Sequence, residues 1–363
     1  MQEGVYMIRT TFFSLFILLV FFFLILIFGT CSESTDPTPP VTKEVIRWNF
    51  GSAQTVLTSG NLGSWDDHHV GWASVILDSD TLKMWYSASN ASDNIWAIGY
   101  AWSLDGLSWT RYSGNPVMTK TYTWEDLAQP VVIKDGNLYR MWYQGWVGAE
   151  PVVVGYATSP DGKNWTKREN PVMDITFGSG EKTQIGLWSV LKIGSSFAGW
   201  YYWTDENWND HWTSGKGFTG YASSSDGISW EDHGTCLSCS GSGWDADFAI
   251  TPLVTNSDIT LNNETISYHM LYLGFDTDSR EPSIGYASSQ DTYAFKKYEM
   301  NPVKWYLDLH TISGSGITLS SVLCDWPETG DFHVWYTESP YGGISSRLNY
   351  LKGKLTVEEV EVQ

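Results

Sequence analysis

The chain is poor in basic residues and in cysteine. It has 21 Lys plus Arg against 41 Asp plus Glu, which gives a formal net charge of −20. Phosphates would be repelled by such a chain, so we expect no nucleic-acid partner. With only four cysteines and no second closely spaced pair, a zinc site is not indicated. Phosphate-binding loops, nucleophile elbows and cofactor motifs are absent too, and we expect no cofactor and no metal.

Aromatic residues and glycine are abundant instead. Aromatics make up 15% of the chain, with 21 Trp and 20 Tyr, and there are 34 Gly. This mixture argues against a disordered chain, a coiled coil or a helical bundle. The apolar fraction of 42% is sufficient for a globular core. The composition therefore indicates an exported all-β protein.

The N-terminus has the pattern of a targeting segment. An apolar run from Phe12 to Phe28 follows Arg9. The run leads into Gly29-Thr30-Cys31, which resembles a bacterial lipobox in which Cys31 would be lipidated; the alternative is an uncleaved signal anchor. We expect a signal peptide over 1–30, a Pro-rich polar tether over 31–43 and the folded domain over 44–363. The protein would then be a membrane-anchored lipoprotein at the cell surface or in the periplasm.

The remaining cysteines allow two readings. Cys236 and Cys239 are close enough in sequence for a small disulfide, which an oxidising compartment would permit but does not require. Cys324 stands in an apolar run and is expected to be a buried small residue.

Short motifs recur along the chain after residue 60. One motif is a triplet that ends in tyrosine, at Met84-Trp85-Tyr86, Met141-Trp142-Tyr143, Gly199-Trp200-Tyr201, Met270-Leu271-Tyr272 and Val334-Trp335-Tyr336. Gly-Tyr-Ala follows at Gly99, Gly155, Gly220 and Gly285, with Asn349-Tyr350-Leu351 as the fifth copy. Ser-x-Asp-Gly-x-x-Trp comes next at Ser103, Ser159 and Ser224, and Asn-Pro-Val occurs at Asn115, Asn170 and Asn301. Such regular recurrence indicates a repeat architecture.

Each repeat has the pattern of four strands. Ser74 to Leu77 is a continuous apolar run, Lys83 to Ala88 and Ala97 to Ser103 alternate, and an Asp-Gly turn leads to an outer strand. Four-stranded units repeated radially form a β-propeller. The repeats begin near Trp65, Trp124, Glu181, Trp244 and Gly314, which predicts a single five-bladed propeller.

The last blade lacks a complete set of strands of its own. Ile46 to Phe50 resembles an outer strand, and we expect this N-terminal strand to help close the last blade. The rival is Leu355 to Val362, which could fold back across Gly353 onto Ser346 to Lys352; both could contribute.

The complete set of motifs resembles the five-bladed propeller glycosidases, namely glycoside hydrolase families 43, 32 and 130 and their uncharacterised relatives. The resemblance covers residues 60–351. It implies that a sugar binds at one mouth of the central channel, in the loops that enter the innermost strands. It also implies that the Asp-Gly turns, with Asp105, Asp161 and Asp226, lie at the opposite end.

Several carboxylates lie in the predicted mouth loops. A glycosidase needs one carboxylic acid and one carboxylate base or nucleophile. Asp66, Glu125 and Asp245 follow a repeated tryptophan and can equally be scaffold. The acids that the repeat does not demand are the candidate catalytic residues: Asp67, Asp126, Glu181 and Asp247.

The resemblance also raises a conflict. In families 43 and 32 the catalytic acids stand at the start of the first strand. Counting from the Trp-Tyr motifs, the matching residues here are Trp72, Gln129, Leu187 and Thr251, none of which is acidic. Either the acids lie a few residues upstream, or the propeller has lost catalysis.

Aromatic and polar residues near the mouth are the candidate sugar contacts. Trp72, Trp146, Trp188, Trp203, Trp208 and Trp212 fall in or beside mouth segments, whereas Trp85, Trp142, Trp200 and Trp335 repeat and are expected between blades. The predicted substrate-binding residues are His68, His69, Trp72, Gln129, Trp188 and Trp208.

Three functions are compatible with this pattern. The first is an enzyme that hydrolyses a glycosidic bond in a polysaccharide or oligosaccharide. The second is a non-catalytic glycan-binding propeller at the cell surface. The third is a structural or protein-binding propeller.

Overall fold

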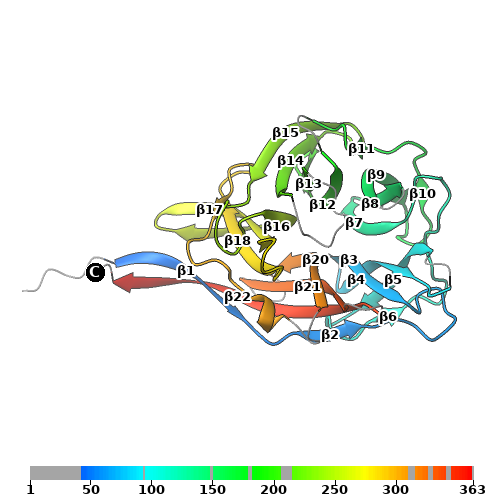
Figure 1. The fold of residues 1–363 in the computed structure, drawn as a ribbon, viewed down its shortest axis with the longest axis horizontal. Coiled ribbons are helices and arrows are strands. Elements are labelled where there is room, and N and C mark those ends of the chain that lie inside the picture. The colour runs from blue at the N-terminus through cyan, green and yellow to red at the C-terminus, as the bar shows by residue number, and fades with distance from the viewer. Residues whose placement is uncertain are drawn as a thin grey trace, which may run out of the picture. The chain divides into compact units, whose positions relative to one another are not determined.

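The computed structural model describes residues 42–92, 95–147, 150–178, 182–205, 215–309, 315–325, 330–340 and 345–361. In these residues the chain is all-β apart from one short 3-10 turn, η1 (Tyr306–Asp308), as the composition predicts (Figure 1). No helix in the described part is long and apolar enough to span a membrane. Residues Glu44–Glu358 form one compact unit. The predicted signal peptide and Cys31 lie outside the described residues.

The strands follow the predicted repeats. The first sheet has the order β3-β4-β5-β6, and its strands are β3 (His69–Asp78), β4 (Thr81–Ser89), β5 (Trp96–Ser103) and β6 (Thr110–Arg111). The second has the order β10-β9-β8-β7, with β11 also paired to β9. Its strands are β7 (Ala128–Asp135), β8 (Leu138–Val147), β9 (Glu150–Ser159), β10 (Thr166–Lys167) and β11 (Met173–Asp174). Both sheets are antiparallel meanders, and their fourth strands are only two residues long.

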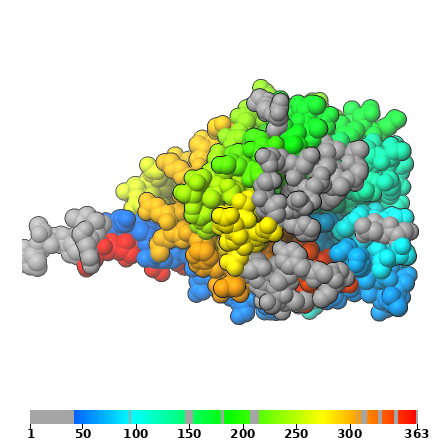
Figure 2. Space-filling view, viewed as in Figure 1, coloured from blue at the N-terminus to red at the C-terminus, as the bar shows by residue number. Residues whose placement is uncertain are grey.

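The third and fourth repeats share one sheet. The strands of the third are β12 (Gln184–Ile193), β13 (Ser196–Thr204), β14 (Gly217–Ser224) and β15 (Trp230–Leu237). Those of the fourth are β16 (Phe248–Leu261), β17 (Glu264–Phe275), β18 (Ser283–Ser289) and β19 (Lys296–Lys297). A single parallel pair, Gly217 with Phe248, joins the two groups. Figure 2 shows that the green, yellow and orange surfaces of successive segments adjoin one another.

The last sheet takes strands from both ends of the described chain. Its order is β1-β22-β21-β20, with β2 also paired to β22, and its strands are β1 (Thr42–Phe50), β2 (Gln54–Leu57), β20 (Ser315–Cys324), β21 (Asp331–Pro340) and β22 (Arg347–Glu361). The N-terminal strand thus joins the last repeat, as predicted. The alternative, in which Leu355 to Val362 folds back across Gly353, is wrong. Strand β22 continues through Gly353, which pairs with Phe332 of β21.

The first strands of the repeats are in contact in a closed cycle. Contacts run from β3 to β7, β12, β16 and β20 in that order, and β20 again contacts β3. Serine hydroxyls on these strands accept hydrogen bonds from the next strand of the cycle. The Val132 amide donates to the Ser74 hydroxyl at 2.9 Å, and the Val75 amide donates to the Ser321 hydroxyl at 3.0 Å. The cycle is therefore joined by polar contacts as well as by apolar packing.

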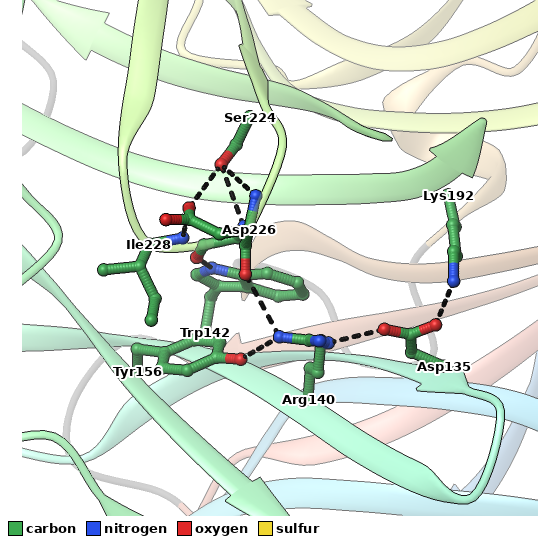
Figure 3. A network of polar contacts seen from close by, with 9 residues as sticks. Asp135, Arg140, Trp142, Tyr156, Lys192, Ser224, Asp226 and Ile228 are labelled. Carbon is green, nitrogen blue, oxygen red and sulfur yellow. Dashed lines mark hydrogen bonds and ion pairs between the residues drawn. The ribbon is translucent and has the colours of Figure 1, made fainter. Parts of the chain in front are cut away.

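Neighbouring repeats are also joined by hydrogen bonds from the repeated tryptophans, which we call the tryptophan lock. The Trp142 indole is fully buried and donates a hydrogen bond of 2.8 Å to the Gly227 carbonyl in the Asp-Gly turn of the next repeat (Figure 3). Trp85 does the same to Gly162 at 2.7 Å. The matching bond from Trp200 goes to Thr292 at 3.0 Å, and that from Trp335 goes to Gly106 at 3.4 Å. The prediction that these four indoles are buried between repeats is confirmed.

The Asp-Gly turns are built to present that carbonyl. The Asp226 carboxylate accepts the amides of Ile228 and Ser229, both at 2.7 Å, and the Ser224 hydroxyl accepts the Gly227 amide at 2.8 Å. Asp105 and Asp161 make the same bonds. These aspartates are structural turn residues, as expected.

The junction between the fourth and fifth repeats lacks this tryptophan hydrogen bond. The fourth triplet has Leu271 in place of tryptophan, and in the fifth repeat the continuous strand β22 replaces the Asp-Gly turn. Trp48 from β1 packs there instead, edge-on to Tyr286 of the fourth repeat at 5.0 Å and to Phe332 of the fifth at 4.8 Å. The two sequence exceptions therefore belong to the same junction.

The acids that follow a repeated tryptophan form buried ion pairs. Asp66 pairs with Arg111 at 3.1 Å, Glu125 with Lys167 at 2.7 Å and Asp245 with Lys297 at 2.5 Å. The triplet tyrosine joins two of these pairs, because Tyr143 donates to Glu125 at 2.7 Å and Tyr272 to Asp245 at 3.2 Å. These three acids are scaffold, which was one of the two readings of the sequence.

The third repeat carries the same pair with its charges exchanged. Lys182 lies five residues before the register shift of its innermost strand, as Asp66 and Asp245 do. Asp232 faces Ala222 as the bases Arg111, Lys167 and Lys297 face the alanines of the other Gly-Tyr-Ala motifs. Tyr201 donates to Asp232 as its counterparts donate to their acids. Burial lowers the pKa of Lys182, and the charge of Asp232 opposes that effect. The first four repeats therefore each place one pair of opposite charges at this site, and the acid and the base can exchange places between the loop and the outer strand.

This exchange predicts the outcome of a charge-reversal experiment. Asp232→Lys alone should lower the free energy of unfolding by about 2–4 kcal/mol, because two ammonium groups would share one partly buried site. Adding Lys182→Asp should restore more than half of the loss in urea denaturation. A double variant no more stable than the sum of the two single changes would contradict the pairing.

The tryptophan lock gives a second prediction. Trp142→Phe should cost about 1–3 kcal/mol, because the Gly227 carbonyl would lose a buried donor. Trp102 is 40% exposed and serves as the matched control; Trp102→Phe should change the stability by less than about 0.5 kcal/mol. Equal effects of the two changes on thermal unfolding would argue against the lock.

Candidate functional site

Each innermost strand is interrupted by a β-bulge at the same position. The register shifts fall at Gly71/Ala73, Ala128/Val131, Leu187/Ser189, Ile250/Leu253 and Leu319/Ser321. Three bulge residues have left-handed backbone although none is glycine: Trp72 (φ 41°), Gln129 (φ 50°) and Thr251 (φ 53°). Such backbone is uncommon for bulky or β-branched residues and concentrates at functional sites. These three residues stand at positions where the resemblance to families 43 and 32 predicts catalytic acids.

Neighbouring repeats hold the strained residues in place. The Trp72 amide donates to the Thr337 hydroxyl at 2.6 Å, and the Gln129 amide donates to the Ser87 hydroxyl at 2.9 Å. Thr337 and Ser87 occupy the same position, one residue after the triplet tyrosine. The bulge backbone is therefore fixed by the second strand of the preceding repeat, β21 for Trp72 and β4 for Gln129.

A small hollow lies among the bulges. It is shallow and partly open to solvent, has room for about one water molecule, and is lined by Trp72, Gln129, Pro130, Val131, Leu187, Trp188, Leu319 and Ser320. Three predicted substrate-binding residues, Trp72, Gln129 and Trp188, are thus brought together. No carboxylate of the described residues lines the hollow.

Trp188 forms a wall of this hollow. It is only 7% exposed, donates its indole hydrogen to the Leu319 carbonyl at 3.1 Å and meets the Tyr202 ring edge-on at 5.3 Å. These contacts fix the indole, so a ligand would meet a rigid surface.

A partly exposed aromatic cluster continues outward from Trp72. The Trp96 ring lies 4.9 Å from Trp72 and stacks on His69 at 5.5 Å, and the His68 ring lies 3.9 Å from His69. The sequence analysis missed Trp96. Its signal was available: this tryptophan opens the third strand of the first repeat, and the repeat motif does not demand one there.

His69 is a neutral member of this cluster. Burial lowers its pKa to about 4, and the nearby His68 adds to the effect. Nδ1 of His69 also lies 3.0 Å from the hydroxyl oxygen of Ser346, which is hydrogen-bond distance. At neutral pH His69 therefore offers hydrogen bonds and a ring face rather than a positive charge.

The described candidate acids are each held by a local contact. Asp67 accepts the amides of Gly63 at 2.6 Å and Ala91 at 2.8 Å, which lower its pKa. Asp126 pairs with Lys120 at 3.2 Å. Asp247 accepts the amide of Thr277 at 2.9 Å and its hydroxyl at 2.8 Å. Each carboxylate therefore stabilises the loop that leads into an innermost strand.

The other candidates fall partly outside what the structure describes. Glu181, Trp208 and Trp212 lie outside the described residues, as does the side chain of Trp146. Within the described residues, no group of three or more His, Cys, Asp or Glu side chains could hold a metal ion. Cys236, Cys239 and Cys324 are free, so the disulfide alternative is absent from this structure.

Solved structures share this fold. A glycosyl hydrolase from Bacteroides ovatus matches with a TM-score of 0.57 and 15% identity, over 84% of this chain and 94% of that one. A β-1,2-mannobiose phosphorylase from Listeria innocua, in complex with β-1,2-mannobiose, matches with a TM-score of 0.57 and 13% identity, over 82% and 94%. A family 32 β-fructofuranosidase from Bombyx mori matches with a TM-score of 0.55 and 13% identity, over 85% and 63%. The fold is that of the glycosidase-like propellers, as the motifs predict.

Sequence comparison identifies a nearer relative. No family model matches the chain. The uncharacterised protein Rv1502 of Mycobacterium tuberculosis is 31% identical over 215 residues, which cover 56% of this chain and 68% of the relative. The chain therefore belongs to the same family as this mycobacterial protein, within the glycosidase-like propeller fold.

Proposed function

We propose that this protein binds a carbohydrate at the propeller mouth without cleaving it. The observation that carries the proposal is the lining of the hollow: two indoles, an amide and a hydroxyl, with no carboxylate among the described residues. Two carboxylates are the usual requirement for glycosidic hydrolysis. Aromatic faces and neutral hydrogen-bonding groups suffice for binding a sugar.

The structural neighbours support a carbohydrate as the ligand. They include a phosphorylase in complex with β-1,2-mannobiose and a β-fructofuranosidase. The same mouth in this chain carries the cluster of Trp72, Trp96 and His69 beside the hollow. Sugar C–H faces pack on such rings while hydroxyls reach Gln129 and Ser320.

The proposal includes the architecture and location of the protein. We take the cycle from β3 to β20 as a propeller of five blades, the last completed by the N-terminal strand. The apolar run before Cys31 supports an exported, membrane-anchored lipoprotein. The bound glycan would then lie outside the cytoplasm.

Hydrolysis is the second candidate function. It rests first on Asp67, which is ionised because hydrogen bonds from two backbone amides lower its pKa. It also rests on the acids in the other mouth loops, which are Asp126, Glu181 and Asp247. A carboxylate that is ionised at neutral pH suits a base or nucleophile. Release of sugar from a polysaccharide, abolished by Asp67→Asn, would favour this candidate over binding alone.

The binding proposal predicts a loss of affinity when the aromatic cluster is broken. Trp96→Ala should weaken binding by about threefold to tenfold, since an aromatic contact contributes about 0.5–1.5 kcal/mol beyond the area that it buries. The measurement is calorimetric titration with β-1,2-mannobiose and soluble mannan, inulin, xyloglucan and galactan. The same samples should release no sugar.

The matched control lies on the same strand. Trp102 is at the other end of β5, beside the Asp-Gly turn, and Trp102→Ala should leave the affinity unchanged. If no carbohydrate of the panel binds, or if both tryptophan changes weaken binding equally, the proposal is wrong.

A further inference from the structure

The tyrosine of the Gly-Tyr-Ala motif is less covered in the third repeat than in the others. Tyr221 is half-buried there, whereas the other copies are each 6% exposed or less: Tyr100, Tyr156, Tyr286 and Tyr350. The third repeat also has Ala198 two residues before the middle of its triplet, where the other repeats carry the bases Lys83, Arg140, His269 and His333.

The missing base explains part of this exposure. In the fourth repeat Nδ1 of His269 lies 2.7 Å from the Tyr286 hydroxyl, and the two rings stack. Ala198 cannot make such a contact, and the Tyr221 hydroxyl instead accepts a hydrogen bond from the Thr292 hydroxyl at 3.0 Å. Tyr221 therefore lacks the cover that a basic side chain gives to its counterparts.

Two other rings lie against Tyr221 on the outside of the ring of sheets. The outer strand β15 has a register shift beside Tyr221, where Gly234 takes a φ of 85° (Figure 1). The His233 ring stacks on Tyr221 there, with centroids 5.1 Å apart. Tyr293, from the fourth repeat, meets Tyr221 edge-on at 6.0 Å and donates to the Thr235 carbonyl at 3.3 Å. We call the rings of Tyr221, His233 and Tyr293 the outer platform.

The outer platform is open to solvent where an equivalent ring is covered. His233 is exposed, and Tyr293 is 41% exposed. Tyr112 occupies the position of His233 in the first repeat, one residue after the outer-strand member of the ion pair. There the Lys163 ammonium lies over the Tyr112 ring at 4.9 Å and over the Tyr100 ring at 5.6 Å. The repeat therefore does not require exposed rings at this position.

The surroundings of the outer platform narrow the class of ligand. Nε2 of His233 lies 2.8 Å from the Ser223 hydroxyl, which fixes the imidazole, and Glu231 faces Ser223 on the neighbouring strand. Two exposed rings among polar groups are too small a patch for a stable protein interface, which buries about 800 Å² of each partner. Nucleobases also stack on rings, but a net charge of −20 repels their phosphates. A sugar, with a flat C–H face and hydroxyls at its edge, fits both the rings and the polar border.

From these observations we infer that the outer platform is a second carbohydrate-binding site, with the sugar packed on His233 and Tyr293 and with Tyr221 supporting both rings. This site goes beyond the proposed function, which concerns only the mouth. Because a polysaccharide repeats the same sugar, one kind of chain can occupy both sites and gain affinity from the second contact.

The first test counts the sugars bound per chain by calorimetric titration with β-1,2-mannobiose and short oligosaccharides of the panel glycans. The wild type should bind two, and the double variant His233→Ala/Tyr293→Ala should bind one. A single site that the double variant retains at full affinity would overturn the outer platform and leave mouth binding intact. A single site that the double variant loses and Trp96→Ala retains at full affinity would support the platform and overturn mouth binding. Absence of binding in the wild type would overturn both.

The second test separates ring contact from a structural role. Tyr293→Ala should weaken binding at the platform by about threefold to tenfold, whereas Tyr293→Phe keeps the ring and should keep the affinity. Because Tyr293 is exposed, neither change should shift the melting temperature appreciably.

The matched control is Tyr112→Ala, which removes the equivalent ring that Lys163 covers. This change should leave the affinity of both sites unchanged. Equal losses of affinity in Tyr293→Ala and Tyr112→Ala, or in Tyr293→Ala and Tyr293→Phe, would show that no sugar packs on the Tyr293 ring and would overturn the assignment.

Discussion

The hydrogen bond from a buried indole to the turn of the next repeat is the interaction on which this fold depends. A propeller has no covalent link between the inner parts of neighbouring sheets, and apolar packing alone does not fix how far one sheet is rotated against the next. The bond from Trp142 to the Gly227 carbonyl does fix it, because a buried donor and acceptor must find each other. Asp226 and Ser224 shape the turn so that this carbonyl points at the neighbour. Two motifs that look independent in the sequence are the two halves of one contact.

Once the lock and the buried ion pairs are assigned, most repeated residues are accounted for by the scaffold. What remains near the channel is unrepeated: an indole at 72, an amide at 129 and a hydroxyl at 251, each at an equivalent bulge. The fold supplies a fixed backbone at each bulge, strained at three of the five, and leaves the side chain free to vary. Related propellers can therefore differ completely in chemistry while their sheets remain superimposable.

The sequence predicted the repeats, the turns, the buried indoles and the N-terminal strand because each depends on a local pattern that recurs. It did not predict that Lys182 and Asp232 exchange the charges of the other ion pairs, since in the first, second and fourth repeats it is an acid that follows the tryptophan. It missed Trp96 because a single unrepeated tryptophan can be told from core only by knowing its neighbours in space, here Trp72 and His69. The hairpin across Gly353 failed for a similar reason. Glycine permits a turn, but the partner strand β21 extends far enough to keep β22 straight.

The junction that lacks the tryptophan lock determines when the ring can close. There Leu271 replaces the indole, and Trp48 of the N-terminal strand packs against Tyr286 and Phe332 instead. Since β1 pairs with β22, the first and last described strands of the chain meet in one sheet. Contacts this distant in sequence form slowly, because the entropy cost of closing so long a loop must be met before the contact contributes. The last sheet, and with it this junction, can therefore be completed only once β22 is available to pair with β1.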